Sequence, residues 1–557
     1  MPQTWDIQAD VVVVGFGAAG ACAALEAAGA GSDVVVLDRF HGGGATALSG
    51  GVVYAGGGTP QQREAGVSDS PEAMFDYLSL EVGDAVSPGT LLEFCQGSPA
   101  MLAWLERHGV PFEGSLCPDK TSYPTNRHYL YYSGSELSAR DVAPPAPRGH
   151  RARGRGTSGG LLFARLAEAV RGSGAGVLGQ TSARRLITDS AGRVVGVECR
   201  TLRGAPGWAR AAHRVLHRWS ARPYLYAPKL GRAWHRPVAW LERRRGRPLL
   251  VAARRGVVLA AGGFVANRQM MREHAPAYRG GLPLGTPGDD GSGIRLGTEV
   301  GGATAFLDRV SVWRFLSPPA ALLSGVLVDR AGLRVCDESR YGAAIGEAIV
   351  TRHRGQAWLL VDQATVAAAR RQLRGTTLWF QRLQAWYLLT AGRVSAPTVA
   401  GLAARAGIDA GGLAATLDAY NAAAAGLANP AAGLANPAGQ PADPSGQPAD
   451  PAGKPADLVR AQDRPPYSLI DLSVRPRLAY PAPMLTLGGL VVAEETGQVR
   501  RADGTTVPGL YAAGRTAVGL CSHSYVSGLS LADCVFSGRR AGRHAAAAID
   551  AQQRETQ

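Results

Sequence analysis

The chain has 557 residues, a formal net charge of +15, 46% hydrophobic residues and 18% charged residues. This length exceeds what one hydrophobic core usually organises, and the composition excludes wholesale disorder. The seven cysteines are odd in number and never form a CxxC pair, which argues against a disulfide framework or a zinc site. We therefore expect a cytoplasmic protein without a metal centre.

The positive charge is concentrated in one segment. From Trp208 to Arg247 the chain holds eleven Lys or Arg against the single acid Glu242, which places +10 of the net charge there. The rest of the chain has no charge pattern typical of nucleic-acid binding, so nucleic acid is not an expected partner. No export signal and no run long enough to span a bilayer is recognisable.

The first predicted unit, residues 10–38, consists of a strand, a glycine turn, an Ala-rich helix and a second strand. The turn is a GxGxxG motif made by Gly15, Gly17 and Gly20, and the second strand ends at Asp38. The first glycine permits the turn, the second lets a pyrophosphate approach the backbone, and the third allows tight helix packing. A carboxylate at the end of the second strand can accept hydrogen bonds from a ribose diol, so the unit predicts dinucleotide binding.

Further along the chain, residues 161–170 predict an amphipathic helix, and residues 193–201 and 248–260 predict two strands that can pair as a hairpin. The basic segment is then an insertion between these two strands. Mixed strands and helices follow up to about Tyr420. The Pro-rich repeats of residues 422–457 cannot support a packed core and predict a mobile surface loop that carries no chemistry.

These elements predict an α/β protein with a Rossmann-like dinucleotide-binding domain and an inserted α+β catalytic (cap) domain. The expected limits are residues 1–270 for the first part of the dinucleotide-binding domain, with a basic amphipathic insert at 205–248. The cap domain is expected at 271–464 and includes the Pro-rich loop. Residues 465–557 are expected to complete the dinucleotide-binding domain.

Three further motifs accompany the glycine turn: Gly43GlyAlaThrAlaLeuSerGlyGly51, Val257ValLeuAlaAlaGlyGlyPhe264 and Pro508GlyLeuTyrAlaAlaGly514. With these blocks in order, the sequence resembles the flavoproteins of the fumarate reductase and 3-ketosteroid dehydrogenase family over most of its length. The resemblance implies that FAD is the cofactor, so residues 1–270 and 465–557 would form a Rossmann-like FAD-binding domain of the glutathione-reductase type. It also implies that the C-terminal segment folds back to complete the FAD site.

The turn, the acid and the resemblance together give the candidate cofactor-binding residues. They are Gly15, Gly17, Ala18, Ala19, Gly20, Asp38, Arg39, Gly44, Ala45, Thr46, Ser49, Gly50, Gly51, Ala261, Gly262, Gly514, Arg515, Ser530 and Leu531. Membrane-bound members of the wider group tether FAD through a histidine, and Gly44 stands at the matching position. His41 is nearby but out of register, so we expect non-covalent FAD.

The C-terminal block also differs from that of the dicarboxylate reductases in this group, which use an arginine there as proton donor. Tyr525 stands in that position, and Cys521 stands where a histidine usually precedes the arginine. Losing the arginine removes a bidentate clamp for carboxylates, whereas a tyrosine can hydrogen-bond a ketone. Tyr525ValSerGly528 resembles the Tyr-X-Ser-Gly of the Δ4-(5α)-3-ketosteroid dehydrogenases more than the arrangement of the Δ1 enzymes.

The resemblance makes Tyr525 and Ser527 the candidate catalytic residues. Ser527 is too weak a base alone, so we expect Tyr525 to relay charge while backbone amides of Gly51 or Gly489 stabilise the enolate oxygen. Gly528 is a further candidate substrate contact.

The Δ4 enzymes have another tyrosine in the segment that matches Trp313–Pro319, and Ser317, which stands at its position, is the third candidate catalytic residue. Either a water replaces that phenol or the substrate or reaction differs. Four other tyrosines, Tyr123, Tyr129, Tyr131 and Tyr132, are alternative phenols, although packing is the more common role of such a cluster.

The leading hypothesis is an FAD-dependent dehydrogenase that introduces a C4–C5 double bond into a 3-ketosteroid or related ring ketone. A steroid-like hydrophobic substrate and a quinone or other electron acceptor are then the expected partners. One alternative is a flavin-dependent reductase of an enone or an α,β-unsaturated acid. A second is a non-catalytic, membrane-associated flavoprotein.

The basic insert has an amphipathic pattern. Val215, Leu216 and Trp219 share one predicted helix face, while arginines at four-residue spacing occupy another. Trp and Arg on such a helix suit an anionic lipid surface, so the insert predicts peripheral contact with the inner face of the plasma membrane. A solvated basic hairpin or a dimer contact is the alternative.

Overall fold

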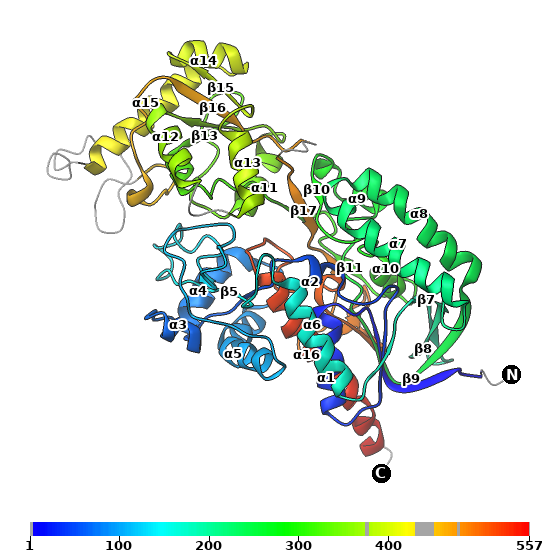
Figure 1. Cartoon of the computed structure of the whole chain (residues 1–557). Coiled ribbons are helices and arrows are strands. Elements are labelled where there is room, and N and C mark those ends of the chain that lie inside the picture. The colour runs from blue at the N-terminus through cyan, green and yellow to red at the C-terminus, as the bar shows by residue number, and fades with distance from the viewer. Residues whose placement is uncertain (1–3, 374–377, 429–449, 476–479, 556–557) are drawn as a thin grey trace.

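The computed structural model describes residues 4–373, 378–428, 450–475 and 480–555 (Figure 1). Its largest sheet has eight strands, with a path of order β19-β20-β9-β1-β2-β6 and with β8 and β7 continuing from β9. The strands are β1 (Ile7–Val14), β2 (Val34–Leu37), β6 (Gly176–Leu178), β7 (Thr181–Thr188), β8 (Val194–Thr201), β9 (Arg247–Leu259), β19 (Gln498–Arg500) and β20 (Thr506–Ala512).

The parallel core of this sheet follows directly from the sequence pattern. Strand β1 pairs in parallel with β2, Val11 opposite Val34, and with β9, Val14 opposite Leu259. Because side chains alternate across a strand, Val11 and Val13 enter one hydrophobic cluster and Val12 and Val14 enter the other. The predicted doubly wound unit is confirmed.

The C-terminal segment completes the same layer. Strand β20 pairs in parallel with β9, and helices α1 (Ala18–Gly29) and α16 (Leu529–Glu555) lie side by side with α6 (Gly159–Gly172) against α1 (Figure 1). Small residues permit the close approach of α1 and α16, since a Cβ on Gly538 would lie 2.5 Å from the Ala19 carbonyl oxygen. The expectation that the end of the chain returns to the first unit is confirmed.

A smaller subdomain follows the glycine turn. It contains the three-stranded sheet β3-β5-β4. Its elements are α2 (Gly44–Leu48), β3 (Val52–Tyr54), α3 (Pro60–Glu64), α4 (Pro71–Val82), α5 (Pro88–Arg107), β4 (Leu130–Tyr131) and β5 (Gly149–Arg151).

The cap domain, at the upper left of Figure 1, has an antiparallel sheet of order β13-β14-β16-β15. Its elements are β13 (Val326–Val328), α11 (Gly342–Arg352), β14 (Trp358–Val361), α12 (Gln363–Gln372), α13 (Trp379–Leu388), β15 (Arg393–Ala396), α14 (Val399–Ala406), α15 (Ala410–Ala428) and β16 (Tyr467–Asp471). The predicted boundary at residue 464 is therefore too early, because β16 lies beyond it and pairs with β14 and β15.

Short elements connect the cap to the large sheet. They are α9 (Arg268–His274), β10 (Leu282–Pro283), α10 (Ser292–Thr298), β11 (Thr304–Ala305), β12 (Val310–Val312), β17 (Pro483–Thr486) and β18 (Gly489–Leu490). Strand β17 lies between β10 and β12, and β11 pairs with β18, so chain segments before and after the cap are joined in two small sheets.

The basic insert forms a helical hairpin of α7 (Gly207–Tyr226) and α8 (Pro228–Arg245). It leaves the sheet between β8 and β9, which pair in antiparallel register from Gly196 opposite Ala252 to Thr201 opposite Arg247. The predicted β-hairpin with an inserted segment is confirmed. In Figure 1 the two helices run side by side next to α9 and β10.

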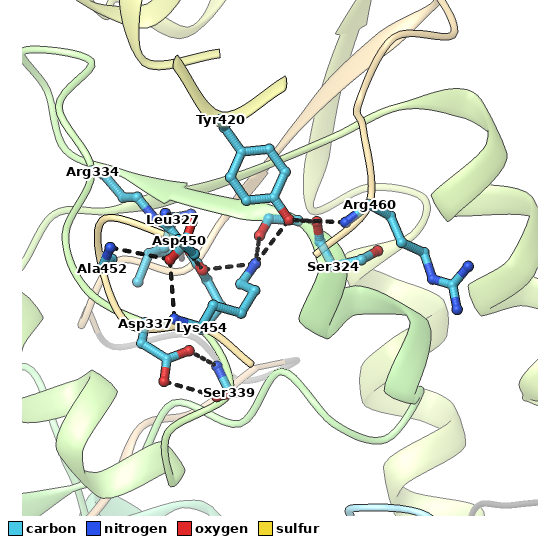
Figure 2. Close-up of polar contacts among 12 residues, drawn as sticks. Ser324, Leu327, Arg334, Asp337, Ser339, Tyr420, Asp450, Ala452, Lys454 and Arg460 are labelled. Atoms are coloured by element: carbon cyan, nitrogen blue, oxygen red, sulfur yellow. Dashed lines mark hydrogen bonds and ion pairs between the residues drawn. The ribbon is translucent and has the colours of Figure 1, made fainter. Parts of the chain in front are cut away.

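The segment predicted as a Pro-rich loop is structured at both ends. Helix α15 continues to Ala428, and after it Lys454 is buried with its Nζ 2.8 Å from Glu338 Oε2. Lys454 Nζ also donates to the Tyr420 hydroxyl, and Arg334 pairs with Asp450 (Figure 2). These buried charges are each compensated by a partner, so this end of the segment carries structural chemistry that the sequence did not predict. The predicted loop at 429–449 lies outside the described residues.

Candidate active site and cofactor cavity

One large cavity runs between the large sheet, the hairpin insert and the cap domain. Its volume is about 1610 Å³, which is more than a single drug-sized ligand needs. Residues of the glycine turn line it together with Tyr525 and with side chains of α7 and α13. The volume therefore leaves room for a dinucleotide and a second molecule.

The glycine turn has the geometry that its spacing predicts. Gly15 has φ +104°, and a Cβ on it would lie 2.4 Å from the Ala260 carbonyl oxygen. A Cβ on Gly20 would lie 1.9 Å from the Gly15 carbonyl oxygen, so that glycine permits packing rather than ligand contact. Gly17, in contrast, lines the cavity at the N-terminus of α1, where backbone N–H groups favour a phosphate.

Two side chains retain hydrogen-bonding capacity that a bound dinucleotide would use. The Asp38 carboxylate accepts from the amides of Phe16, Phe40 and Gly42, and a carboxylate offers about four acceptor positions. Arg515 donates to Asp289 Oδ1 at 2.6 Å, while its Nη1 is buried without a hydrogen-bond partner among the described residues. An acceptor for a ribose and a donor for a phosphate therefore fit FAD.

Most of the other candidate cofactor residues also line the cavity. These are Ala18, Ala19, Arg39, Gly44, Ala45, Thr46, Ser49, Gly50, Gly51, Ala261, Gly262 and Leu531. Gly514 and Ser530 are not among its lining residues. Gly514 is packed against Ala19 and Cys534, with its amide donating to Ser537 Oγ, and Ser530 lies in the first turn of α16.

Four aromatic side chains form a closed ring at one end of the cavity. The ring centroids are 5.2 Å apart for Trp313 and Tyr525, 5.8 Å for Trp313 and Phe315, 5.5 Å for Phe315 and Tyr341, and 6.4 Å for Tyr341 and Tyr525. All four residues line the cavity. Such a surface suits a flat, apolar ligand that carries one polar group. We call this part of the cavity the aromatic end.

Ser527 lies at the aromatic end, but its partners differ from those expected. Its hydroxyl hydrogen-bonds the Tyr131 hydroxyl at 3.0 Å. No hydrogen bond between Ser527 and Tyr525 is found among the described residues. In place of the Tyr525–Ser527 contact that the expected relay needs, Ser527 pairs with Tyr131.

The three phenols around Ser527 stay protonated at neutral pH. Burial raises the pKa of Tyr525, which neighbouring Cys521 raises further and Arg515 opposes. Burial likewise raises the pKa of Tyr131, which the hydrogen bond with Ser527 opposes, and burial together with neighbouring Tyr525 raises the pKa of Tyr341. Protonated phenols donate hydrogen bonds, so the aromatic end is suited to hold a ketone oxygen.

Ser317 lines the cavity, yet its hydroxyl is used elsewhere. Its Oγ donates to the Lys120 carbonyl oxygen at 2.6 Å. Another segment brings a phenol to the aromatic end, because the ring of Tyr341, which precedes α11, lies 6.4 Å from that of Tyr525. Of the alternative tyrosines, Tyr123 and Tyr129 pack on Arg151, with its Cζ 4.8 and 5.0 Å from their ring centroids.

The expected backbone donors are only partly in place. Gly51 lines the cavity, but its amide donates to Ser49 Oγ at 3.1 Å. Gly489 is not a lining residue, and a Cβ on it would lie 2.6 Å from the Thr516 carbonyl oxygen. Gly528 lines the cavity beside Tyr525. The phenols are therefore better placed than Gly489 to face a ligand oxygen.

The opposite end of the cavity, beside Asp38, is strongly basic. Lining residues there include Arg39, His41 and Arg184, and α7 adds Arg214, His217, Arg218 and Ala221. We call this part the adenosine end, because Asp38 is the expected ribose ligand. The sequence indicated helix α7 but not its place at this cavity, since nothing in a local pattern links α7 to Arg39.

None of the described helices has both the length and the apolar character needed to cross a bilayer.

Comparisons with known proteins agree with this geometry. A family model described as an FAD binding domain matches residues 10–530. The chain is 37% identical over 530 residues to the 3-oxo-5-alpha-steroid 4-dehydrogenase of Comamonas testosteroni, covering 92% of this chain and 93% of that protein. It is 28% identical to a 3-oxosteroid 1-dehydrogenase of Mycobacterium tuberculosis, covering 93% and 94%.

A solved structure gives the same result. The 3-ketosteroid-delta4-(5alpha)-dehydrogenase of Rhodococcus jostii RHA1, in complex with 4-androstene-3,17-dione, superposes with a TM-score of 0.78 at 32% identity. The match covers 98% of each chain. The chain therefore belongs to the FAD binding domain family and is an FAD-dependent oxidoreductase.

Proposed function

We propose that the chain is a 3-ketosteroid Δ4-dehydrogenase, which removes hydrogen from C4 and C5 of a 5α-3-ketosteroid. The observation that carries this proposal is the aromatic end, where Tyr525, Tyr341 and Ser527 converge beside Trp313 and Phe315. Relatives named for Δ4 dehydrogenation of 3-oxo steroids support the choice of substrate.

In this proposal the aromatic ring orients the steroid and excludes water, while the protonated Tyr525 donates to the C3 ketone oxygen. That hydrogen bond stabilises the enolate that develops when C4 loses its proton. FAD, when bound, supplies the acceptor for the C5 hydride.

Ser527 accepts the C4 proton through its hydroxyl oxygen. Tyr131 holds that hydroxyl, and Tyr131 with the neighbouring phenol of Tyr341 passes on the proton that Ser527 releases. Burial keeps these phenols protonated near neutral pH. Only a small fraction is deprotonated and able to take the proton from Ser527, and this fraction limits the rate of proton transfer. Ser317 has no proton-transfer role in this scheme.

FAD would be held without a covalent bond. Gly17 and Ala18 face the pyrophosphate, Asp38 takes the ribose, and Arg515 Nη1 provides a charged donor. Gly44 offers no side chain for a tether. His41 lines the cavity, and burial together with Arg214 lowers its pKa, which keeps the ring neutral.

The electron acceptor and a membrane contact belong to the same proposal. We expect an apolar quinone-like acceptor and peripheral binding at the cytoplasmic face of the membrane. The support is the outer surface of the hairpin, where large apolar side chains are exposed. They are Trp208, Val215, Trp219, Leu230, Trp234 and Trp240.

The test is anaerobic mixing of the purified holoenzyme with 5α-androstane-3,17-dione while the oxidised flavin absorbance is followed. We expect bleaching by this saturated ketone and no bleaching by its C4–C5 unsaturated product. If only the chemically reduced enzyme reacts, being reoxidised by an enone or by fumarate, the dehydrogenase proposal fails and a reductase replaces it. If neither reaction occurs, the chain is a non-catalytic flavoprotein.

A further inference from the structure

The basic insert is tied to the cofactor region by its single acid. Glu242 is 6% exposed, and its two carboxylate oxygens each accept from Arg39 at 3.0 Å. Glu242 also contacts His213 Nε2 at 3.2 Å, and Arg39 reaches Asp290 at 3.0 Å. Since Arg39 follows the expected ribose ligand Asp38, this bidentate pair fixes the hairpin against the end of β2.

Two further contacts hold α7 in the same place. The His217 ring stacks on Phe40, with centroids 3.7 Å apart and an interplanar angle of 3°. Gln180, in the turn before β7, donates from Nε2 to the Arg210 carbonyl oxygen at 2.9 Å. The hairpin is therefore packed against Phe40 and Gln180, whose backbones are joined by a hydrogen bond of 2.8 Å, and a solvated hairpin would not require these contacts.

The face of α7 that lines the cavity carries charge. Arg214, His217, Arg218 and Ala221 follow the i, i+3, i+4, i+7 spacing of one helix face, and all four line the cavity. Val215 and Trp219 lie on the other face and are 53% and 65% exposed. Two of the arginines that the sequence suggested for a lipid surface, Arg214 and Arg218, therefore line the adenosine end, where both are exposed.

These side chains have unused binding capacity. Arg184, Arg214 and Arg218 make no ion pair within the described part of the chain. His217 Nδ1 is buried and has no hydrogen-bond partner among the described residues. Guanidinium groups stack on aromatic bases and bind phosphate oxygens, and an imidazole nitrogen can hydrogen-bond the edge of a purine.

We propose that the α7–α8 hairpin is a cover for the adenosine half of FAD, in which Arg214, His217 and Arg218 contact the adenine, the ribose or the adjacent phosphate. Glu242 acts as a positioning residue, because it reaches the cofactor only through Arg39. The proposal rests on FAD binding and not on the steroid reaction, so the two can fail separately.

The experiment measures FAD release from the full-length holoenzyme by the rise of flavin fluorescence after dilution. Arg214→Ala/Arg218→Ala should release FAD on the order of tenfold faster, because charged hydrogen bonds and stacking are lost. Arg243→Ala/Arg244→Ala is the matched control: it removes the same charge from exposed positions of the same hairpin that do not line the cavity, and release should stay within about twofold of the wild type.

Two more variants exclude loss of folding as the cause. Glu242→Gln should also accelerate release, and the far-UV circular dichroism of each variant should match the wild type. Replacing residues 202–246 by Asn-Gly should join β8 to β9 in their existing register and give the fastest release.

Wild-type release from the Arg214→Ala/Arg218→Ala protein, or from the replaced protein, overturns the proposal. Loss of binding to vesicles with an anionic lipid, with unchanged FAD release, would also overturn it, since the arginines would then serve the membrane.

Discussion

The two ends of the cavity use opposite means to hold polar groups. At the aromatic end, Tyr525 and Tyr341 are uncharged donors inside a ring of apolar surface. At the adenosine end, Arg39, Arg214 and Arg218 present permanent charge that is partly open to solvent. A neutral ketone that must become an enolate needs donors that strengthen as charge develops, whereas a phosphate-bearing cofactor is already charged and needs cations that remain in place.

The largest effect is expected for Tyr525→Phe. It removes the phenol proposed to donate to the ketone oxygen but keeps the ring that stacks on Trp313. Flavin bleaching by the saturated ketone should slow by about 10²- to 10⁴-fold. The FAD content, measured by absorbance after denaturation, should be unchanged. A rate within tenfold of the wild type would remove Tyr525 from the mechanism.

Tyr341→Phe tests whether Tyr341 takes the part of the family tyrosine whose position is occupied by Ser317. The variant loses a phenol of the aromatic end that belongs to the proposed relay, and bleaching should slow by about 10²-fold. Ser317→Ala is the matched comparison, because its hydroxyl serves the Lys120 carbonyl, and its rate should stay within about threefold. A larger loss of rate for Ser317→Ala than for Tyr341→Phe would show that Ser317, and not Tyr341, takes part in catalysis.

The pH dependence of bleaching should distinguish the aromatic end from an ordinary histidine site. Burial raises the pKa of Tyr131 and of Tyr341, so the deprotonated relay becomes more populated as the pH rises. Between pH 7 and 10 the rate should increase by up to about tenfold per pH unit, and Tyr341→Phe should reduce this slope. A bell-shaped profile centred near pH 7 would contradict the phenol relay.

The outer face of the hairpin should matter for lipid binding and not for the cavity. Trp219→Ser/Trp234→Ser removes two exposed indoles, and binding to vesicles that contain an anionic lipid should weaken by about tenfold in co-sedimentation. Leu333→Ser, at an exposed apolar position of the cap domain, should leave sedimentation unchanged. If the tryptophan variant sediments as the wild type does, the hairpin does not contact lipid.

FAD binding at the adenosine end should weaken by a few-fold in acid. Burial and neighbouring histidines lower the pKa of His217 to about 3, so the docked hairpin loses stability as the pH falls from 6.5 toward that value. Burial alone would raise the pKa of Glu242, but His213 and Arg39 lower it to about 2, so its contribution is lost below about pH 4.5.

Both groups act in the same direction, but only the His217 contribution changes between pH 7 and pH 5, because that of Glu242 is lost below about pH 4.5. FAD should therefore leave the holoenzyme a few-fold faster at pH 5 than at pH 7, as measured by flavin fluorescence. His41, His213, His235 and Arg39 surround His217, and their positive charge adds to the penalty for its protonation. In the variant with residues 202–246 replaced, this pH dependence should be absent. Its persistence there would assign it to another part of the chain.

The sequence was sufficient where a function depends on neighbouring residues along the chain. Three features were predicted because a short sequence motif marks each of them. They are the turn at Gly15, Gly17 and Gly20, the acid at Asp38 and the return of the C-terminal segment. Matching motifs position by position failed for Ser317. A phenol can reach the same point from any backbone, and here it comes from the start of α11.

The insert shows a second limit. Its periodicity predicted helices with an apolar and a basic face, yet periodicity does not say which face meets the protein. That choice depends on Glu242 pairing with Arg39, about two hundred residues away in sequence. A single buried acid in a basic segment was the signal available, since it must find a partner.

The buried contact between Lys454 and Tyr420 has a consequence for the length of the chain between them. In this stretch the sequence repeats GlyLeuAlaAsnPro twice and GlnProAlaAspPro twice. Lys454 Nζ lies 3.2 Å from the Tyr420 hydroxyl, so the two flanks are held together (Figure 2). Each doubling of the intervening length costs only about 0.6 kcal/mol in closure entropy. Residues can therefore be added or removed between Ala428 and Asp450, the partner of Arg334, without disturbing the cap domain, and this stretch is a natural place to insert a label or a fused domain.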